Sequence, residues 1–180
     1  MGNDDLATER PGLVAIHDAH ADFVWRSLQR LGVPPADLED ALQEVFVVVH
    51  QRLGTFRGSS KLTTWLFGIT LRVASRFRRR PHVRREQSEE DLAHHAQADA
   101  SAGPEAEALQ REERALLLAV LDTLDPEKRV VLVMFELERI DATAIGEALG
   151  IPVGTVHSRL RAARAQFAKA ATRLRMRRER

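Results

Sequence analysis

Residues 141–164 read DATAIGEALGIPVGTVHSRLRAAR, and this stretch indicates how the second half of the chain folds. Asp141 is of a type that caps the N-terminus of a helix, and Gly150 is of a type that ends one. After the short turn, the next helix is expected to begin at about Thr155. Its buried face repeats at helical spacing: Val156, Leu160, Ala163 and Phe167. Two helices joined by so short a turn predict a helix-turn-helix.

The opposite face of the second helix carries small and basic residues. These are Gly154, Ser158, Arg161, Ala162 and Ala165, with His157 and Arg164 on a flank. Such a face suits entry into the major groove of duplex DNA. Arg161 is placed to reach a guanine, whereas Arg159 and Arg164 are better placed for phosphates. Most helix pairs of this kind bind nothing, but the basic second helix favours DNA binding here.

The rest of the chain also predicts helices, and no strand is expected. The expected helices are Gly12–Leu31, one capped by Asp37, one after Ser60, Glu112–Asp122, and one from Pro126 through Glu138 capped by Asp125. Residues 86–110 hold seven acidic residues and no lysine or arginine, which predicts a flexible acidic linker. His94 and His95 lie in this linker, but nothing there fixes a coordination geometry, so no metal site is expected.

The helix after Asp37 has an acidic outer face in its first turns. The face consists of Asp37, Glu39, Asp40, Gln43 and Glu44. Acidic residues favour any helix N-terminus, which explains the first turn. It does not explain Gln43 and Glu44 beside Val47, which is expected to be exposed. We therefore interpret this face as a surface for a partner.

The helix after Ser60 has a regular apolar stripe and, beside it, a basic track. The stripe is Leu62, Leu66, Ile69, Val73 and Phe77, and the track is Trp65, Arg72, Arg76 and Arg79. An aromatic ring beside a row of arginines is typical of surfaces that hold single-stranded nucleic acid. The preceding loop, Gly54–Ser60, has two interpretations. Phe56 and Arg57 can hold a base, or Phe56 can fill the core, which the composition alone favours.

Composition narrows the class of protein. The chain has 180 residues, no cysteine, an acidic N-terminus without an apolar core, and 27 basic residues of which only three are lysines. The arginine bias is explained equally well by phosphate contacts and by a GC-rich genome. The longest strongly apolar run, Val45–Val49, is too short to cross a bilayer. No nucleophile with its base, phosphate loop or metal cluster is present in the sequence. We therefore expect a cytoplasmic, non-enzymatic protein without a cofactor.

Several motifs together resemble one family. DALQEVF at 40–46, FRG at 56–58 followed by TWL at 64–66, LDP at 124–126 and GIPVGTVHSRLRAAR at 150–164 occur in a characteristic order and spacing. In these motifs the chain resembles the extracytoplasmic-function (group 4) sigma factors of bacterial RNA polymerase, in the sigma-70 class. It departs from many relatives at Phe135, where they carry arginine, and at Arg139, where they carry glycine.

The resemblance implies a role for each surface. The polymerase-binding residues would be Asp37, Glu39, Asp40, Gln43 and Glu44. Contacts with the −10 element would come from Phe56, Arg57, Ser59, Ser60, Lys61, Trp65, Arg72, Arg76 and Arg79. Contacts with the −35 element would come from Thr155, His157, Ser158, Arg159, Arg161 and Arg164. The partners implied are core RNA polymerase, promoter DNA and an anti-sigma factor.

The expected organisation is all-α, with two small helical domains joined by a flexible acidic linker. Residues 1–11 would be a tail, 12–82 sigma region 2, 83–110 the linker, 111–175 sigma region 4 with the helix-turn-helix, and 176–180 a basic tail. Two other functions fit part of the chain. A stand-alone helix-turn-helix regulator leaves the basic track unused, and an adaptor that binds polymerase without reading DNA leaves Ser158 and Arg161 unused.

Overall fold

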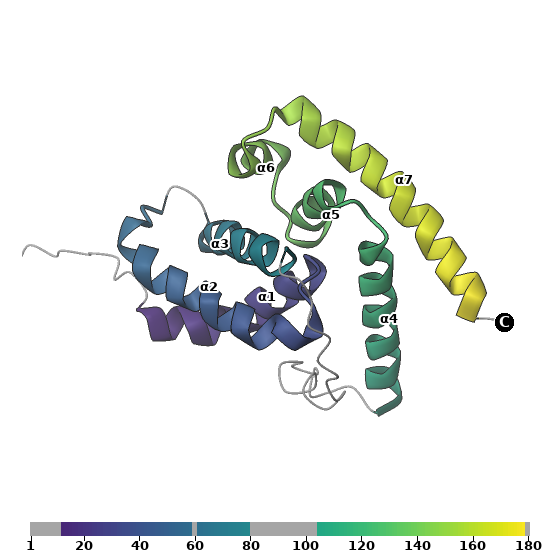
Figure 1. Cartoon of the computed structure of the whole chain (residues 1–180), viewed down its shortest axis with the longest axis horizontal. Coiled ribbons are helices and arrows are strands. Elements are labelled where there is room, and N and C mark those ends of the chain that lie inside the picture. The colour runs from purple at the N-terminus through teal and green to yellow at the C-terminus, as the bar shows by residue number, and fades with distance from the viewer. Residues whose placement is uncertain (1–11, 59–60, 80–103, 179–180) are drawn as a thin grey trace, which may run out of the picture.

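The computed structural model describes residues 12–58, 61–79 and 104–178, and within these ranges the chain is helical without strands (Figure 1). We call residues 12–79 the N-terminal half and residues 104–178 the C-terminal half. The first contains α1 (Leu13–Arg30), α2 (Leu38–Arg52) and α3 (Leu62–Phe77), with single 3-10 turns at Pro35–Asp37 and Leu53–Thr55. The second contains α4 (Pro104–Asp122), α5 (Pro126–Leu132), a π-helical segment (Val133–Leu137), α6 (Ala142–Leu149) and α7 (Val153–Arg178). The predicted all-α class is confirmed.

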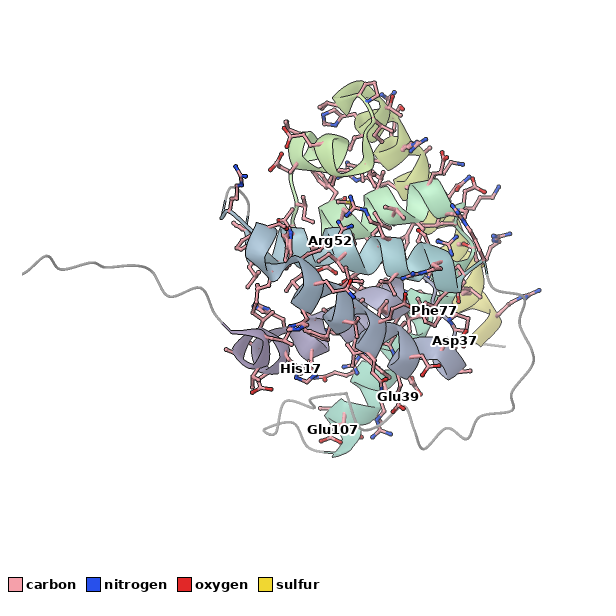
Figure 2. All side chains as sticks on the ribbon, turned by 60° about the vertical axis from the view of Figure 1, so that its left-hand side comes forward. His17, Asp37, Glu39, Arg52, Phe77 and Glu107 are labelled. Carbon is pink, nitrogen blue, oxygen red and sulfur yellow. The ribbon has the colours of Figure 1, made fainter. Side chains whose placement is uncertain are left out.

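The N-terminal half is a unit of three helices, each of which packs against the other two. Because α2 and α3 run antiparallel, Asp37 and Phe77 lie at the same end of the unit (Figure 2). Most of the apolar stripe expected on the helix after Ser60 is buried in α3, and Leu28 of α1, Val45 of α2 and Val73 of α3 are almost fully buried. Burial of each such side chain contributes about 1.5–3 kcal/mol.

Of the three expected N-caps, the structure confirms one. The carboxylate of Asp141 accepts hydrogen bonds from the backbone N–H groups of Thr143 and Ala144, both at 3.0 Å. Asp37 and Asp125 occupy N-cap positions, but neither side chain accepts a capping hydrogen bond, so this part of the expectation is wrong. Asp37 closes a 3-10 turn and has ψ near 1°, which is not the extended conformation of a capping residue.

The start of α4 in the C-terminal half differs from the sequence-based expectation. Helix α4 begins at Pro104, so residues 104–110 are helical, although we assigned them to the flexible linker. Proline is favoured in a first helical turn, and Glu105 and Glu107 add negative charge where the helix dipole favours it. The expected linker residues 83–103, with His94 and His95, lie outside the described residues, as does the tail 1–11.

The helix expected from Pro126 through Glu138 is interrupted. It is α-helical only to Leu132 and continues as a π-helical segment, in which Glu138 N–H donates to the Val133 carbonyl at 3.0 Å. The segment ends at Leu137, and Arg139, two residues further on, has φ of +54°, which makes it the one non-glycine residue with positive φ among the described residues. A side chain with a Cβ is disfavoured in this left-handed region.

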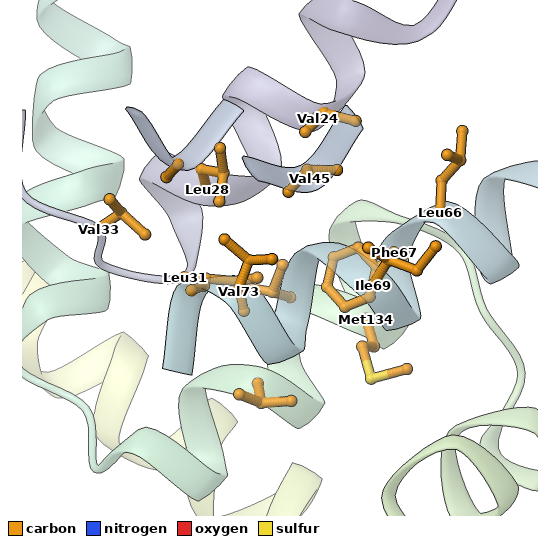
Figure 3. Packing of buried hydrophobic residues seen from close by; sticks show 14 of the residues in the cluster. Val24, Leu28, Leu31, Val33, Val45, Leu66, Phe67, Ile69, Val73 and Met134 are labelled. Carbon is orange, nitrogen blue, oxygen red and sulfur yellow. The ribbon is translucent and has the colours of Figure 1, made fainter. Parts of the chain in front are cut away.

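The two halves share one hydrophobic core. Met134 of the π-helical segment is fully buried and belongs to the same cluster as Phe67 and Ile69 of α3, beside which it lies in Figure 3. The sequence indicated two domains but not how they contact each other. Their packing is therefore a finding of the structure alone.

Arg139→Gly is expected to raise the free energy of unfolding by about 1 kcal/mol, because glycine adopts positive φ without the steric cost of a Cβ. Arg139→Ala is the matched control, since it removes the same exposed side chain and keeps the Cβ. Urea unfolding of both variants checks this. A glycine variant no more stable than the alanine variant would contradict it.

Candidate nucleic-acid interface

The helix-turn-helix is formed by α6, the turn 150–152 and the first half of α7. Gly150 ends α6 with φ of +65°, as the sequence predicted. A second glycine is equally necessary, because a Cβ on Gly146 would lie 2.9 Å from the Ile151 carbonyl oxygen. Ile145, Val156 and Leu160 are buried and hold the two helices together. These contacts fix the direction in which α7 presents its outer face.

The outer face of α7 carries the residues that we expected to meet DNA. His157, Ser158, Arg161 and Arg164 are exposed, whereas Thr155 and Arg159 are half-buried. The Ser158 hydroxyl donates to the Thr155 carbonyl at 2.9 Å, so its oxygen still has lone pairs to accept a hydrogen bond. Phe167, at the edge of the expected buried stripe, is only half-buried.

Two of the three arginines in the first half of α7 are paired with acidic side chains, one from α5 and one from the π-helical segment. Arg159 Nη2 pairs with Glu127 Oε2 at 2.5 Å, and Arg164 donates through Nε to Glu136 Oε1 at 2.7 Å. Arg164 also lies over the Phe135 ring, 5.4 Å from its centroid, which is cation–π geometry. These pairs could not be predicted from the sequence, because their members lie far apart along the chain.

Arg161 differs from these two arginines. It is exposed, and it has no ion pair among the described residues. A guanidinium that is not already paired can present both donors of its fork to a guanine edge. Among the arginines of the helix-turn-helix, Arg161 therefore has the geometry best suited to reading a base, while the acids hold Arg159 and Arg164 in fixed positions.

The second basic surface lies on α3. Arg72, Arg76 and Arg79 are exposed along one face, and Trp65 at its N-terminal end is half-buried, as the helical spacing predicted. Arg78 lies off this face and donates to the Leu31 carbonyl at 3.3 Å. Burial, then the neighbouring positive charges of Arg129 and Arg79, lower the pKa of Arg78 from its usual high value.

The loop before α3 brings an aromatic side chain to the end of this track. The Phe56 ring lies against Trp65, with ring centroids 5.2 Å apart and planes inclined by 45°. Phe56 is half-buried and does not belong to the hydrophobic core, so the interpretation that it fills the core is wrong. Arg57 and Lys61 are exposed, and Ser59 and Ser60 lie outside the described residues. Two adjacent rings form a surface on which a base can stack.

The acidic face of α2 is also accessible. Glu39, Asp40 and Gln43 are exposed, Asp37 and Glu44 are half-buried, and Val47 is 53% exposed, as expected. Figure 2 shows Asp37 and Glu39 near one end of α2, with Arg52 at the other. Glu44 forms an ion pair with Arg76 of α3. The acidic face and the basic track therefore meet along the contact between α2 and α3.

No helix among the described residues is long and apolar enough to cross a membrane. The described residues also contain no group of three or more histidine, aspartate or glutamate side chains placed to hold a metal ion.

Family models match both halves of the chain. The model of sigma-70 region 2 matches residues 16–87, and that of sigma-70 region 4 matches residues 114–167. These matches fall within or close to the segments in which we expected the two regions. The first match covers the acidic face of α2 and the basic surface of α3, and the second covers the helix-turn-helix.

Curated relatives agree with the family models. The chain is 36% identical over 156 residues to the ECF RNA polymerase sigma factor SigE of Mycolicibacterium smegmatis, an alignment that covers 82% of this chain and 57% of that one. The chain thus spans a little over half the length of that relative. It is 31% identical over 139 residues to the ECF RNA polymerase sigma-E factor of Escherichia coli K12, covering 73% of this chain and 72% of that protein.

Two solved structures share the fold. One is CnrH in complex with the cytosolic domain of CnrY, with a TM-score of 0.62, 22% identity, and coverage of 87% of this chain and 85% of that one. The other is the sigma factor RpoE in complex with the anti-sigma factor NepR from Bartonella quintana, with a TM-score of 0.63, 15% identity, and coverage of 87% and 94%. The curated relatives and the two family models show that the chain belongs to the ECF RNA polymerase sigma factors of the sigma-70 class.

Proposed function

We propose that this protein is an alternative sigma factor, which binds core RNA polymerase and directs it to start transcription at particular promoters. The observation that carries the proposal is the presence in one chain of both sigma-70 regions, each with an exposed basic surface of its own. A stand-alone helix-turn-helix regulator needs only the second of these surfaces. The arginine track of α3 and the Phe56–Trp65 pair favour a protein that also handles unwound DNA.

The two DNA elements are assigned to different halves. The C-terminal half would read the −35 element as duplex, with Arg161 at a base edge and Arg159 and Arg164 near phosphates. The N-terminal half would hold the −10 element as it melts, with a base stacked at Phe56 and Trp65. Unstacking a base costs a few kcal/mol, which contacts along the track must offset. The remaining contacts with the −35 element would come from Thr155, His157 and Ser158, and with the −10 element from Arg57, Ser59, Ser60, Lys61, Arg72, Arg76 and Arg79.

The acidic face of α2 would dock on the polymerase. Its carboxylates are exposed on one side of the helix, beside Val47, and charge complementarity with a basic polymerase surface would orient the complex. We also propose an anti-sigma factor as regulator, because both structural neighbours were solved with a bound partner and one of these is an anti-sigma factor. The protein would act in the cytoplasm and without catalysis of its own, since phosphoryl transfer belongs to the polymerase.

A run-off transcription assay tests the proposal as a whole. Purified protein is added to core polymerase with genomic promoter fragments, and the 5′ ends of the transcripts are mapped. We expect new start sites that neither component produces alone. If none appears where a control sigma factor is active, the sigma-factor function is wrong. Binding of the same fragments without polymerase would then favour a stand-alone regulator.

Arg161→Ala is expected to weaken binding to a −35 duplex about tenfold or more, because a bidentate contact to a guanine contributes roughly 1–3 kcal/mol. Binding to core polymerase should be unchanged. Arg175→Ala is the matched control: it removes an exposed arginine from the same helix, beyond the helix-turn-helix. Fluorescence anisotropy at fixed salt measures both. Equal losses in the two variants would mean that α7 binds DNA by charge alone.

Glu44→Arg is expected to weaken core polymerase binding about tenfold while sparing binding to an isolated −35 duplex, because it reverses a charge on the acidic face. It also places a cation beside Arg76, which can disturb the packing of α2 on α3. The double variant Glu44→Arg/Arg76→Glu restores an ion pair at this position. It should remain defective in polymerase binding, and recovery to wild-type affinity would show that the single variant acts through folding.

A further inference from the structure

One arginine of α7 is held on two sides by the π-helical segment. Arg164 donates through Nε to Glu136 Oε1 at 2.7 Å, and its Nη2 lies 2.6 Å from the same oxygen. Its guanidinium also lies over the ring of Phe135, with Cζ 5.4 Å from the ring centroid. Phe135 and Glu136 are consecutive residues of the segment, so a single turn provides both contacts.

These contacts leave part of the guanidinium available. A guanidinium has five N–H donors in a planar fork, and Glu136 occupies the edge formed by Nε and Nη2. The edge formed by Nη1 and Nη2 has no second carboxylate among the described residues, and the side chain of Arg164 is 54% exposed. Two parallel donors on one edge match the geometry of a phosphate. Arg164 is therefore held in position and in plane, with donors for a phosphate still available.

The place of Arg164 on α7 indicates which part of DNA it can meet. Arg161 lies on the outer face of the helix, and Arg164, three residues later, is rotated from it by roughly 60°. When a helix enters the major groove, the residues on its flanks lie nearer to the sugar–phosphate backbone than to the base edges. Arg164 therefore suits a phosphate rather than a base.

The aromatic contact distinguishes this chain from many relatives, which carry arginine where Phe135 stands. A second cation at position 135 would repel the guanidinium of Arg164, whereas an aromatic ring attracts it. The ring also belongs to a π-helical turn, and such turns are rare and frequently occur at functional sites. Both observations indicate a role for Phe135 beyond packing.

We propose that Phe135 and Glu136 are positioning residues, which hold Arg164 ready for a phosphate of promoter DNA and so strengthen binding without touching DNA themselves. The inference rests on the proposed function, which identifies that DNA as a promoter. A long side chain loses conformational freedom when binding orders it, and here folding has already ordered it. By charge alone Glu136 would weaken binding, because a carboxylate repels a nearby phosphate. Positioning and charge thus predict opposite effects of removing Glu136.

Substitutions at three positions separate positioning from charge. Glu136→Ala removes the charge and the acceptor oxygens, whereas Glu136→Gln removes the charge and keeps an acceptor for Arg164. Phe135→Leu replaces the ring by an apolar side chain without a π face. Glu147→Ala is the matched control, because this carboxylate is exposed on α6 and forms no ion pair among the described residues. The substitutions at Glu136 and Phe135 are also made in an Arg164→Ala background.

Fluorescence anisotropy measures the affinity of each full-length variant for two duplexes over a range of salt concentrations. One duplex carries the upstream element of a promoter mapped by run-off transcription, and the other has the same length and an unrelated sequence. Arg164→Ala should weaken binding and lower the slope of log affinity against log salt by about one, because one phosphate contact is lost. Glu136→Ala and Phe135→Leu should weaken binding roughly twofold to tenfold, which is the cost of ordering one long side chain.

The remaining variants should not weaken binding. Glu136→Gln should bind at least as tightly as the wild type, because it keeps Arg164 in place without the negative charge. Glu147→Ala should also bind at least as tightly, since it changes charge only. In the Arg164→Ala background, Glu136→Ala and Phe135→Leu should cause no further loss, because the side chain that they position is absent.

Three results would overturn the proposal. Tighter binding by Glu136→Ala would show that the carboxylate only masks the charge of Arg164. Losses that persist in the Arg164→Ala background would show that Phe135 and Glu136 act through the fold. Wild-type affinity and salt slope in Arg164→Ala would show that this arginine meets no phosphate.

Two controls keep these outcomes distinct. Circular dichroism identifies a variant that unfolds, and if Glu136→Ala or Phe135→Leu does so, the other decides. If run-off transcription finds no start sites, the proposed function fails. The duplex of unrelated sequence still decides whether Phe135 and Glu136 position Arg164, because a phosphate contact does not depend on sequence.

Discussion

The docking of Arg129 onto the end of α1 is the contact on which the arrangement of the whole molecule depends. Arg129 of the C-terminal half donates to the Arg30 and Gln29 carbonyls in the last turn of α1, and its side chain is itself almost fully buried. The Gln29 carbonyl also accepts a hydrogen bond from the backbone N–H of Gly32 at 3.0 Å. The apolar contacts around Met134 add buried area to the interface, but they do little to determine the relative orientation of the two halves. The guanidinium, by contrast, fits only where Gly32 leaves space for it. Hydrogen-bond geometry thus determines how the two halves sit, and apolar burial stabilises that arrangement.

The arginines of this chain divide into those that are already bound and those that remain available. Arg129, Arg159 and Arg164 are paired with carboxylates inside the protein, whereas Arg72 and Arg161 are exposed without such partners among the described residues. A count of basic residues therefore overstates the charge available to DNA. The paired arginines have a different use, because a guanidinium fixed by an acid loses less conformational entropy when it meets a phosphate.

Local features of the fold were predictable from the sequence. The apolar stripe of α3, the cap at Asp141 and the left-handed Gly150 all depend on residues that lie close to each other along the chain. The π-helical segment was not predictable, because it depends on packing against the other half. The start of α4 was missed because composition alone does not separate an acidic helix from an acidic linker. The resemblance to the family did point to Arg139, because many relatives carry glycine at this position. The structure has positive φ there, which glycine adopts readily.

The candidate surfaces, too, were predictable only where the residues belong to one helix. Periodicity placed Trp65 and the arginines of α3 on one exposed face, since side chains on one helix are related by a fixed rotation. It could not place Phe56 against Trp65, nor Glu44 against Arg76, because each of these pairs joins different segments.

The ion pair between Glu44 and Arg76 affects binding as well. A carboxylate that neutralises Arg76 weakens the attraction of this arginine for phosphate. The acidic face and the basic track are therefore not independent. If a cationic side chain of the polymerase paired with Glu44, Arg76 would be available to bind DNA. Polymerase binding and DNA binding would then favour each other across the contact between α2 and α3, and by linkage this coupling is equal in both directions.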